Sequence, residues 1–462
     1  MGNRNVIRGC DLPEAPGGLP VLGHTWALLR DPMGFLASLA ACGDLVQIRL
    51  GPLRAVAVCN PELVSRVLAD DRTFDKAGGL FERDGRAALG DGLATCPHSR
   101  HRRQRRLIQP AFHRSRLPGY AATMAEQAET VCRGWREGQV VDVPREMKEI
   151  TMRSLSATLF AGMLTASRVL SLADLDTIMA GIYRATVTPP LLARLPTPGN
   201  RRFRRVSARV HRTLHTLIAE RRRDGVDRGD LLSALLAARD PEGTGVDRGL
   251  TDTEIGDQVV TFFVAGTETS AVTVSWALHL LARHPAVQAR VHAEVDAALA
   301  TAPLGIDALD RLELTGRVIA ETLRLYPLPW LCARSVTSDT VLGGHPLPAG
   351  TTVVYAPYVI HHQSGVYDDP DCFDPDRWDP VRPQPPRHSY IPFGGGARKC
   401  IGDEFGTIQA TLVLATVLAH WQLEHVPGPP IRPTLSIVPG PGNLRMRATR
   451  RTRRTAELGT PS

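Results

Sequence analysis

The sequence predicts a mainly α-helical protein with small β-sheets, organised as a single domain over residues 1–462. Two apolar segments have the length and pattern of helices, one of about thirty residues after Thr251 and a shorter one over Thr407–His420. The β-prone segments are short and scattered: Leu45–Leu50 with Ala55–Val58, expected as a hairpin, then Thr351–Tyr355, and Thr434–Val438 after the last apolar helix. No Ser-, Gly- or Pro-rich linker divides the chain, so we expect one domain despite its length.

The N-terminal leader, about residues 1–25, is interrupted by prolines and glycines. It therefore lacks the apolar run of a signal peptide or a membrane anchor, and the longest apolar stretches elsewhere are too short to span a bilayer. The eight cysteines have no paired spacing, which favours reduced thiols over a disulfide framework. We therefore expect a cytoplasmic protein without a membrane anchor.

The net charge of +8 is concentrated in residues 100–106, residues 201–205 and a basic tail, about residues 445–462, that is expected to be flexible. We do not expect nucleic acid as a partner, because aromatic residues make up only 5% of the chain and no nucleic-acid-binding motif accompanies the basic clusters. A docking surface for an acidic electron-transfer protein fits the charge better. The second and third clusters fit a solvated basic face equally well.

Several further helical patterns follow along the chain. In Pro97–Phe112, His101 and Arg105 share one face because they are four residues apart. Thr186–Asn200 holds prolines and a glycine amid leucines, so it is either a lid over an apolar site or an ordinary connection between helices. The remaining helices are expected over Ala121–Trp135, Ile150–Phe160 and Arg204–Arg222.

The long helix after Thr251 begins with a capping box, in which Thr251 and Glu254 each satisfy a free backbone N–H of the other. Its apolar face is interrupted by residues 265–269, A-G-T-E-T. Two interpretations of this turn are open. In one, it is a strained or solvated notch in the helix, because buried polar groups need partners. In the other, Thr269 bonds to a backbone carbonyl and Glu268 points to solvent.

One cysteine stands in a distinctive context, residues 393–402, F-G-G-G-A-R-K-C-I-G, before the helix over Thr407–His420. The glycines let the backbone approach a bulky neighbour, and the helix N-terminus with Arg398 and Lys399 is expected to lower the pKa of Cys400. No second Cys or His lies within a few residues, which argues against zinc; a single thiolate suits an axial haem ligand. The alternative is a Gly-rich surface turn with a buried structural cysteine.

The cysteine segment resembles the cysteine loop of the cytochrome P450 family, F-G-G-G-x-R-x-C-x-G, and matches it at every fixed position. Other family motifs occur in the family's order: a proline-rich leader, A-G-x-[DE]-T at residues 265–269, and E-x-x-R at Glu321 and Arg324, followed by a segment with Arg377. The resemblance covers essentially the whole chain. It implies the cytochrome P450 fold, with haem b buried between the long central helix and the cysteine loop.

The resemblance also assigns roles to individual residues. It implies that Cys400 is the axial iron ligand, that Phe393 packs beside its sulfur, and that Glu268 and Thr269 relay protons. Haem-propionate contacts are implied for His101, Arg105, Arg334 and Arg398. A buried structural triad is implied for Glu321, Arg324 and Arg377.

The implied reaction is a monooxygenation, in which dioxygen and two electrons are used to hydroxylate a C–H bond. The sequence has no flavin-binding, nucleotide-binding or iron–sulfur motif, so the electrons are expected from ferredoxin and ferredoxin reductase. Two alternatives of another class stay open. A haem-thiolate isomerase or dehydratase does not need the Glu268–Thr269 pair, and a non-catalytic haem-binding protein needs neither this pair nor electrons.

The candidate substrate positions are nearly all apolar, which indicates a compact hydrocarbon held by shape. Residues 43–46, 73–76 and 96–98 with the basic helix after them look like bacterial sesquiterpene oxygenases, so we expect a terpenoid substrate and a role in antibiotic biosynthesis. A fatty-acid or macrolide hydroxylase is the alternative. The candidate positions are Phe81, Leu89, Val187, Leu191, Phe262, Phe263, Ala265, Pro329, Trp330, Leu331 and Val438.

Overall fold

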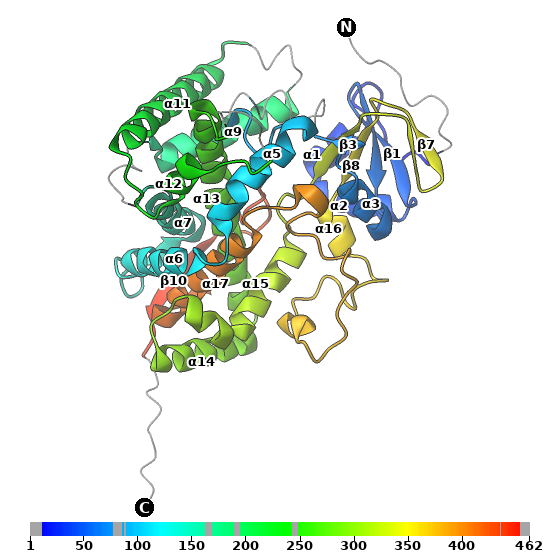
Figure 1. The fold of residues 1–462 in the computed structure, drawn as a ribbon. Coiled ribbons are helices and arrows are strands. Elements are labelled where there is room, and N and C mark those ends of the chain that lie inside the picture. Colours follow the sequence, from blue (N-terminus) through cyan, green and yellow to red (C-terminus); the bar gives the residue numbers. More distant parts are fainter. Residues whose placement is uncertain are drawn as a thin grey trace, which may run out of the picture.

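The computed structural model of the protein describes residues 12–76, 86, 89–161, 169–188, 195–242, 248–434 and 436–452. Most helices gather on one side of the molecule, and the largest β-sheet lies on the other side with the first short helices (Figure 1). This is the mainly α-helical fold with small β-sheets that the sequence predicts.

Helix α13 (Asp252–Arg283) passes through the middle of the helical part (Figure 1). The predicted capping box is present, since the Thr251 hydroxyl accepts from the N–H of Glu254 and the Glu254 carboxylate accepts from the N–H of Thr251. Most α13 residues are buried, as expected for a helix packed on all sides. The helices packed against it are α7 (Val143–Phe160), α11 (Pro198–Asp224), α12 (Leu231–Ala237), α14 (Pro285–Thr301), α15 (Glu313–Leu325) and α17 (Asp403–His420).

The other described helices complete this body and the edge of the large sheet. The predicted helix over Pro97–Phe112 divides into α5 and a 3-10 turn, η1. The bounds are α1 (Thr25–Arg30), α2 (Pro32–Ala40), α3 (Pro61–Ala69), α5 (His98–Ile108), η1 (Gln109–Phe112), α6 (Leu117–Cys132), α9 (Leu172–Val187), η2 (Ile306–Arg311), α16 (Pro357–His361), η3 (Pro375–Trp378) and η4 (Gly396–Arg398).

The largest sheet has five strands in the order β1-β2-β8-β5-β3. The predicted hairpin forms as β1 (Leu45–Leu50) and β2 (Leu53–Val58), and the predicted strand β8 (Thr352–Tyr355) pairs with β2 in parallel. β8 also pairs with β5 (Cys332–Val336), which pairs with β3 (Phe74–Asp75). β6 (Thr340–Leu342) and β7 (His345–Leu347) form a separate hairpin.

Two expectations about the C-terminal region are wrong. Arg445–Arg450, the first part of the tail expected to be flexible, is strand β10, which pairs with both β4 (Val140–Asp142) and β9 (Trp421–His425). Met446 and Ala448 are buried on one face of β10, and the alternating arginines face outward. The β-prone segment at residues 434 and 436–438 is not a strand but a bend, next to a bridge between Pro433 and Pro441.

No helix in the described part of the chain is both long enough and apolar enough to cross a membrane.

Candidate active site

The cysteine loop, residues 393–402, makes a tight turn before α17. Gly396 has a φ of 63°, and a β-carbon there would overlap the backbone carbonyl of Leu68 on α3, so only glycine fits. The N–H of Cys400 donates to the carbonyl of Phe393 at 2.9 Å, and the Phe393 ring packs against the central core. The loop therefore fixes Cys400 directly before the first turn of α17.

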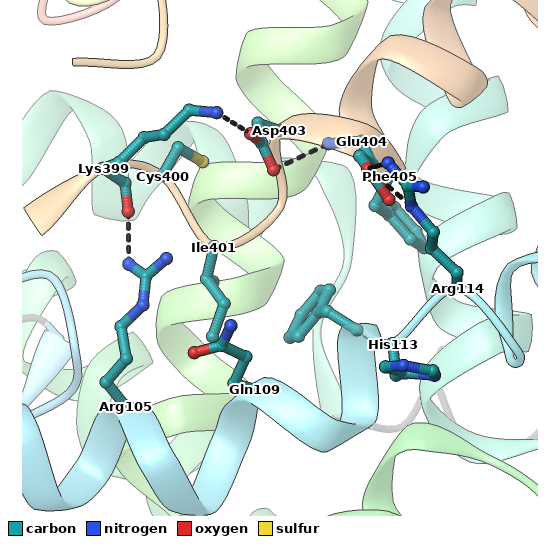
Figure 2. A pocket seen from close by; sticks show the side chains of 11 residues that line it. Arg105, Gln109, His113, Arg114, Lys399, Cys400, Ile401, Asp403, Glu404 and Phe405 are labelled. Carbon is teal, nitrogen blue, oxygen red and sulfur yellow. Dashed lines mark hydrogen bonds and ion pairs between the residues drawn. The ribbon is translucent and has the colours of Figure 1, made fainter. Parts of the chain in front are cut away.

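A pocket of about 370 Å³ opens beside Cys400, between α5 with η1 and the start of α17. Figure 2 shows Arg105 of α5 directed at the cysteine loop, where its guanidinium donates to the carbonyl of Lys399. The ammonium of Lys399 pairs with Asp403. The remaining lining residues are Gln109, Phe112, His113, Arg114, Ile401, Glu404 and Phe405.

The pKa of the Cys400 thiol is raised, whereas the sequence predicted a lowered pKa. Although Cys400 is exposed to the pocket, the loss of hydration around its thiol is the main cause, and it outweighs the hydrogen bond from the backbone N–H of Gly402. The charge of Asp403 also raises this pKa, and the charge of Arg105 lowers it. Cys400 is therefore a neutral thiol at neutral pH in the protein alone, and a bound metal ion would displace its proton.

Arg398 was predicted to help lower the pKa of Cys400, but its guanidinium binds to groups other than the sulfur. Its Nη2 pairs with Asp75 at 2.7 Å, and its Nη1 donates to the carbonyl of Cys96 at 2.8 Å. Asp75 belongs to β3, so the cysteine loop is tied to the edge of the five-stranded sheet. Only the Nε of this buried guanidinium has no hydrogen-bond partner among the described residues.

Two cations beside Arg398, the buried Arg334 and the half-buried Lys76, have no acid partner among the described residues. Arg334 donates to the Tyr355 hydroxyl at 3.1 Å and to the Ala333 carbonyl at 2.8 Å. The Lys76 ammonium donates to the Ala94 carbonyl at 3.1 Å, and its pKa is lowered to about 8, first by burial and then by the charges of Arg334 and Arg398. This pair of cations favours an anionic ligand with two acidic groups.

His101, predicted to share the α5 face of Arg105, is 2% exposed. Its Nδ1 is buried and has no hydrogen-bond partner among the described residues. The pKa of His101 is lowered to about 3 by burial and by nearby cations, Arg398 first. The ring is therefore neutral at physiological pH, and its Nδ1 is an unused donor or acceptor position.

The polar turn of α13, residues 265–269, agrees in part with each of the two interpretations of its sequence. Ala265 is exposed although Phe262 and Thr267 near it are buried. The Thr269 hydroxyl donates to the Ala265 carbonyl at 2.6 Å, as the second interpretation states. Glu268, however, is buried and does not point to solvent. A β-carbon on Gly406 of α17 would lie 3.9 Å from Ser270 Oγ, so this turn adjoins the helix that follows Cys400.

Glu268 pairs with Lys148 of α7, with 2.9 Å between Oε1 and Nζ. Burial raises the pKa of Glu268, and the charge and hydrogen bond of Lys148 oppose this shift. The sequence analysis missed Lys148, as it missed Lys76, because each lies far from its partners in the chain. The composition gave one indication of these two residues, because lysine is rare in this chain. Only three lysines, Lys76, Lys148 and Lys399, occur among the 55 lysine and arginine residues.

The predicted structural triad forms. Glu321 and Arg324 on α15 are fully buried and make two hydrogen bonds of 2.9 and 2.7 Å. Arg377 of η3 lies 3.6 Å from the Glu321 carboxylate, which also accepts from the Trp378 indole at 2.9 Å. Three backbone carbonyls accept from the Arg324 guanidinium, so the pair joins α15 to the segment before the cysteine loop.

The predicted substrate positions differ in their surroundings. Phe263 packs on Phe160 and Phe262 packs on Phe112, and both are at most 7% exposed, so these rings form core contacts and not a free pocket wall. Phe81, Leu191 and the side chain of Val187 lie outside the described residues. Leu89 is partly buried against the main core, and Ala265 is exposed.

Two predicted substrate positions, Trp330 and Val438, lie where the C-terminal bend meets the segment before β5. The Trp330 indole donates to the Ser436 carbonyl at 3.2 Å. Val438 is buried with Val272, Trp276 and Leu328. The structure therefore brings Trp330 and Val438 to the same part of the fold, beside α13.

The first basic cluster is largely neutralised by acids of this chain. Arg100 pairs with Asp91, Arg103 with Glu254 at 2.7 Å, and Arg106 with Asp240 at 3.1 Å. Three arginines of this cluster thus fix α5 to its neighbours, and the cluster is not the open basic surface that the sequence suggested.

Two cations, Lys76 and Arg334, have no acid partner in the described part of the chain and lie near a cysteine at the start of a helix, an arrangement that fits a group with two carboxylates and a metal ion. Haem is such a group, and a protein that binds it through cysteine is a haem-thiolate protein. The model of the family described as Cytochrome P450 matches residues 13–446. The chain therefore belongs to the cytochrome P450 family of monooxygenases, and membership implies a haem-thiolate cofactor.

Several relatives are similar over most of the chain. The chain is 45% identical to pentalenene oxygenase of Streptomyces avermitilis, over 95% of this chain and 97% of that one. It is 45% identical to cyclooctat-9-en-7-ol 5-monooxygenase of Streptomyces melanosporofaciens, over 90% of each chain. A crystal structure of the cytochrome P450DA haem domain superimposes with a TM-score of 0.85 at 27% identity, covering 96% of this chain and 98% of that one.

Proposed function

We propose that this protein hydroxylates, or oxidises further, a terpenoid hydrocarbon, with pentalenene or a similar tricyclic sesquiterpene as the first candidate. The observation that carries this proposal is the 45% identity to pentalenene oxygenase over 95% of the chain. The apolar character of Ala265 and Val438 supports it, because an apolar site holds a hydrocarbon by shape. A role in terpenoid antibiotic biosynthesis follows from the same relative and is part of the proposal.

We propose haem b as the cofactor, with Cys400 as its axial ligand. When bound, this group activates dioxygen so that one oxygen atom enters a C–H bond. The cations Lys76 and Arg334 would each neutralise one propionate, and Arg398 and the free Nδ1 of His101 would add hydrogen bonds. Arg105 would position the loop through the Lys399 carbonyl, and Phe393 would shield the sulfur.

We propose that Thr269 and Glu268 handle the protons of the reaction. The Thr269 hydroxyl donates to the Ala265 carbonyl, so it is oriented and can accept a further hydrogen bond on its oxygen. Glu268 has one carboxylate oxygen, Oε2, without a partner among the described residues. A proton taken up at Oε2 could be passed on through water to the Thr269 hydroxyl.

The proposed electron donors are ferredoxin and its reductase, working in the cytoplasm. Arg114 and Lys399 are 81% and 50% exposed at the pocket beside Cys400, so the cationic side chains at this face could meet an acidic carrier. Arg114 and Lys399 would stay partly paired with Glu404 and Asp403 when the carrier binds. Weak and salt-sensitive association is therefore expected.

The experiment that tests the substrate class is optical titration of the purified ferric protein. Pentalenene, other sesquiterpene hydrocarbons, cyclic terpenoid alcohols, fatty acids and macrolactones are added separately, and the low- to high-spin shift is recorded. We expect a saturable shift with a tricyclic sesquiterpene and none with acids or macrolactones. A shift confined to acids or macrolactones would overturn the terpenoid class and favour the alternative hydroxylases.

Thr269→Ala is expected to bind substrate with an unchanged spin shift but to lose coupling between electrons and product. Proton transfer by a positioned side chain contributes about 10²–10⁴-fold, so product per reducing equivalent should fall at least about tenfold, with hydrogen peroxide formed instead. Thr273→Ala is a matched control, because Thr273 also donates to a helix carbonyl, that of Thr269, at 2.9 Å. Fully coupled turnover in Thr269→Ala would remove Thr269 from the proton relay.

A further inference from the structure

Lys148 lies where three helices meet. Its ammonium pairs with Glu268 Oε1 of α13 at 2.9 Å and with Asp176 Oδ1 of α9 at 3.2 Å. The Glu268 side chain is 10% exposed and that of Asp176 is 62% exposed, so the lysine joins a buried carboxylate to one that is open to solvent. Lys148 itself is 22% exposed.

The elements that carry this ion pair are firmly attached to each other. The Thr151 hydroxyl of α7 donates to the Thr267 carbonyl of α13 at 3.0 Å. This bond lies one residue before Glu268 and three residues after Lys148. Since both side chains stand on packed helices, their separation is set by the fold and not by a loop.

The charge around Glu268 depends on very few groups. Lys148 from α7 lowers the pKa of Glu268 and Asp176 from α9 raises it, both against a larger increase caused by burial. In return, the pKa of Lys148 is raised by both acids although burial opposes this. Within the described residues, Lys148 is therefore the one cation whose charge lowers the pKa of Glu268.

We propose that Lys148 is a positioning residue for Glu268. Lys148 binds Oε1 and holds the carboxylate in its ionised form, and Oε2 is left to take up the proton for Thr269. This proposal rests on the proposed proton relay through Glu268 and Thr269. An uncharged residue at position 148 would leave a buried carboxylate that is protonated in the resting enzyme, and the relay would begin from the wrong protonation state.

The test is an infrared pH titration of the haem-loaded protein, in which the C=O stretching band of a protonated carboxylic acid is assigned to Glu268 by its absence in Glu268→Gln. In Lys148→Met we expect the midpoint of this band to move up by about one to three pH units, as for loss of an adjacent opposite charge. Lys148→Arg should restore a midpoint near that of the wild type. Arg145→Met, which removes an exposed cation from the same helix, should leave it unchanged.

Turnover is measured on the same variants as product per reducing equivalent against pH. We expect the limb that reports ionised Glu268 to move to higher pH in Lys148→Met, with coupling near pH 7 about tenfold lower, and to return in Lys148→Arg. An unchanged infrared midpoint in Lys148→Met would overturn the positioning role. A shifted midpoint with an unchanged turnover profile would instead overturn the relay, and with it the role of Lys148 in the reaction.

Discussion

Cys400→Ala is expected to abolish the thiolate-type spectrum of the carbonyl complex and to lower substrate oxidation by at least about 10³-fold, which corresponds to roughly 4 kcal/mol of activation free energy. Among the described residues, no group of three or more His, Cys, Asp or Glu side chains could hold a metal ion. The measurement is the reduced carbonyl difference spectrum together with haem content.

The loss should be chemical and not a failure to fold. The N–H of Cys400 bonds to the Phe393 carbonyl, and alanine keeps this backbone contact. Cys372→Ala is the matched control, because Cys372 is exposed and only its backbone carbonyl contacts Arg324. We expect the control to keep the spectrum. A thiolate-type spectrum that persists in Cys400→Ala would contradict the axial assignment.

Local sequence signals predicted the features that depend on local interactions. The capping box at Thr251, the pattern of α17 and the hairpin of β1 and β2 were all predicted from neighbouring residues. The pairing of Glu321 with Arg324 also follows from helical spacing, although its burial came from the family resemblance. These predictions succeeded because the partners are close together in the chain.

Features set by distant partners could not be predicted in this way. Lys148 and Glu268 are 120 positions apart, and the charges that lower the pKa of Lys76 belong to Arg334 of β5 and Arg398 of the cysteine loop. The direction of the Cys400 pKa shift was predicted wrongly, because the local sequence indicates a helix N-terminus but does not show which protein groups remove water from the thiol. Strand β10 was missed because its arginines conceal the alternation at Met446 and Ala448.

The substrate positions show the same limit. Apolar character alone selected Phe262 and Phe263, yet both rings are used in packing against Phe112 and Phe160. A helix that crosses the middle of a protein is apolar on every side, so residue type does not tell which side faces a ligand. Ala265 of the same helix is exposed, and it stays a predicted substrate position.

Glu321→Gln is expected to destabilise the protein by about 3–5 kcal/mol, because it leaves the buried charge of Arg324 without its partner. The Glu321 carboxylate accepts from Arg324, the Trp378 indole and the N–H of Asp374, so the loss also loosens the segment that leads to the cysteine loop. Such a loss is a large share of the 5–15 kcal/mol that typically stabilises a folded protein. Urea unfolding followed by circular dichroism measures it, and haem content should fall in parallel.

The matched control for this variant is Arg228→Gln, which breaks an exposed ion pair with Asp224, the last residue of α11. Exposed pairs contribute about 0–1 kcal/mol, since water screens the charges and the long side chains lose freedom. We expect the control to unfold within about 0.5 kcal/mol of the wild type. If Glu321→Gln were equally close to the wild type, Arg324 would have to be satisfied by the carbonyls of His361, Pro370 and Cys372 alone, and the triad would not be what holds this part of the fold.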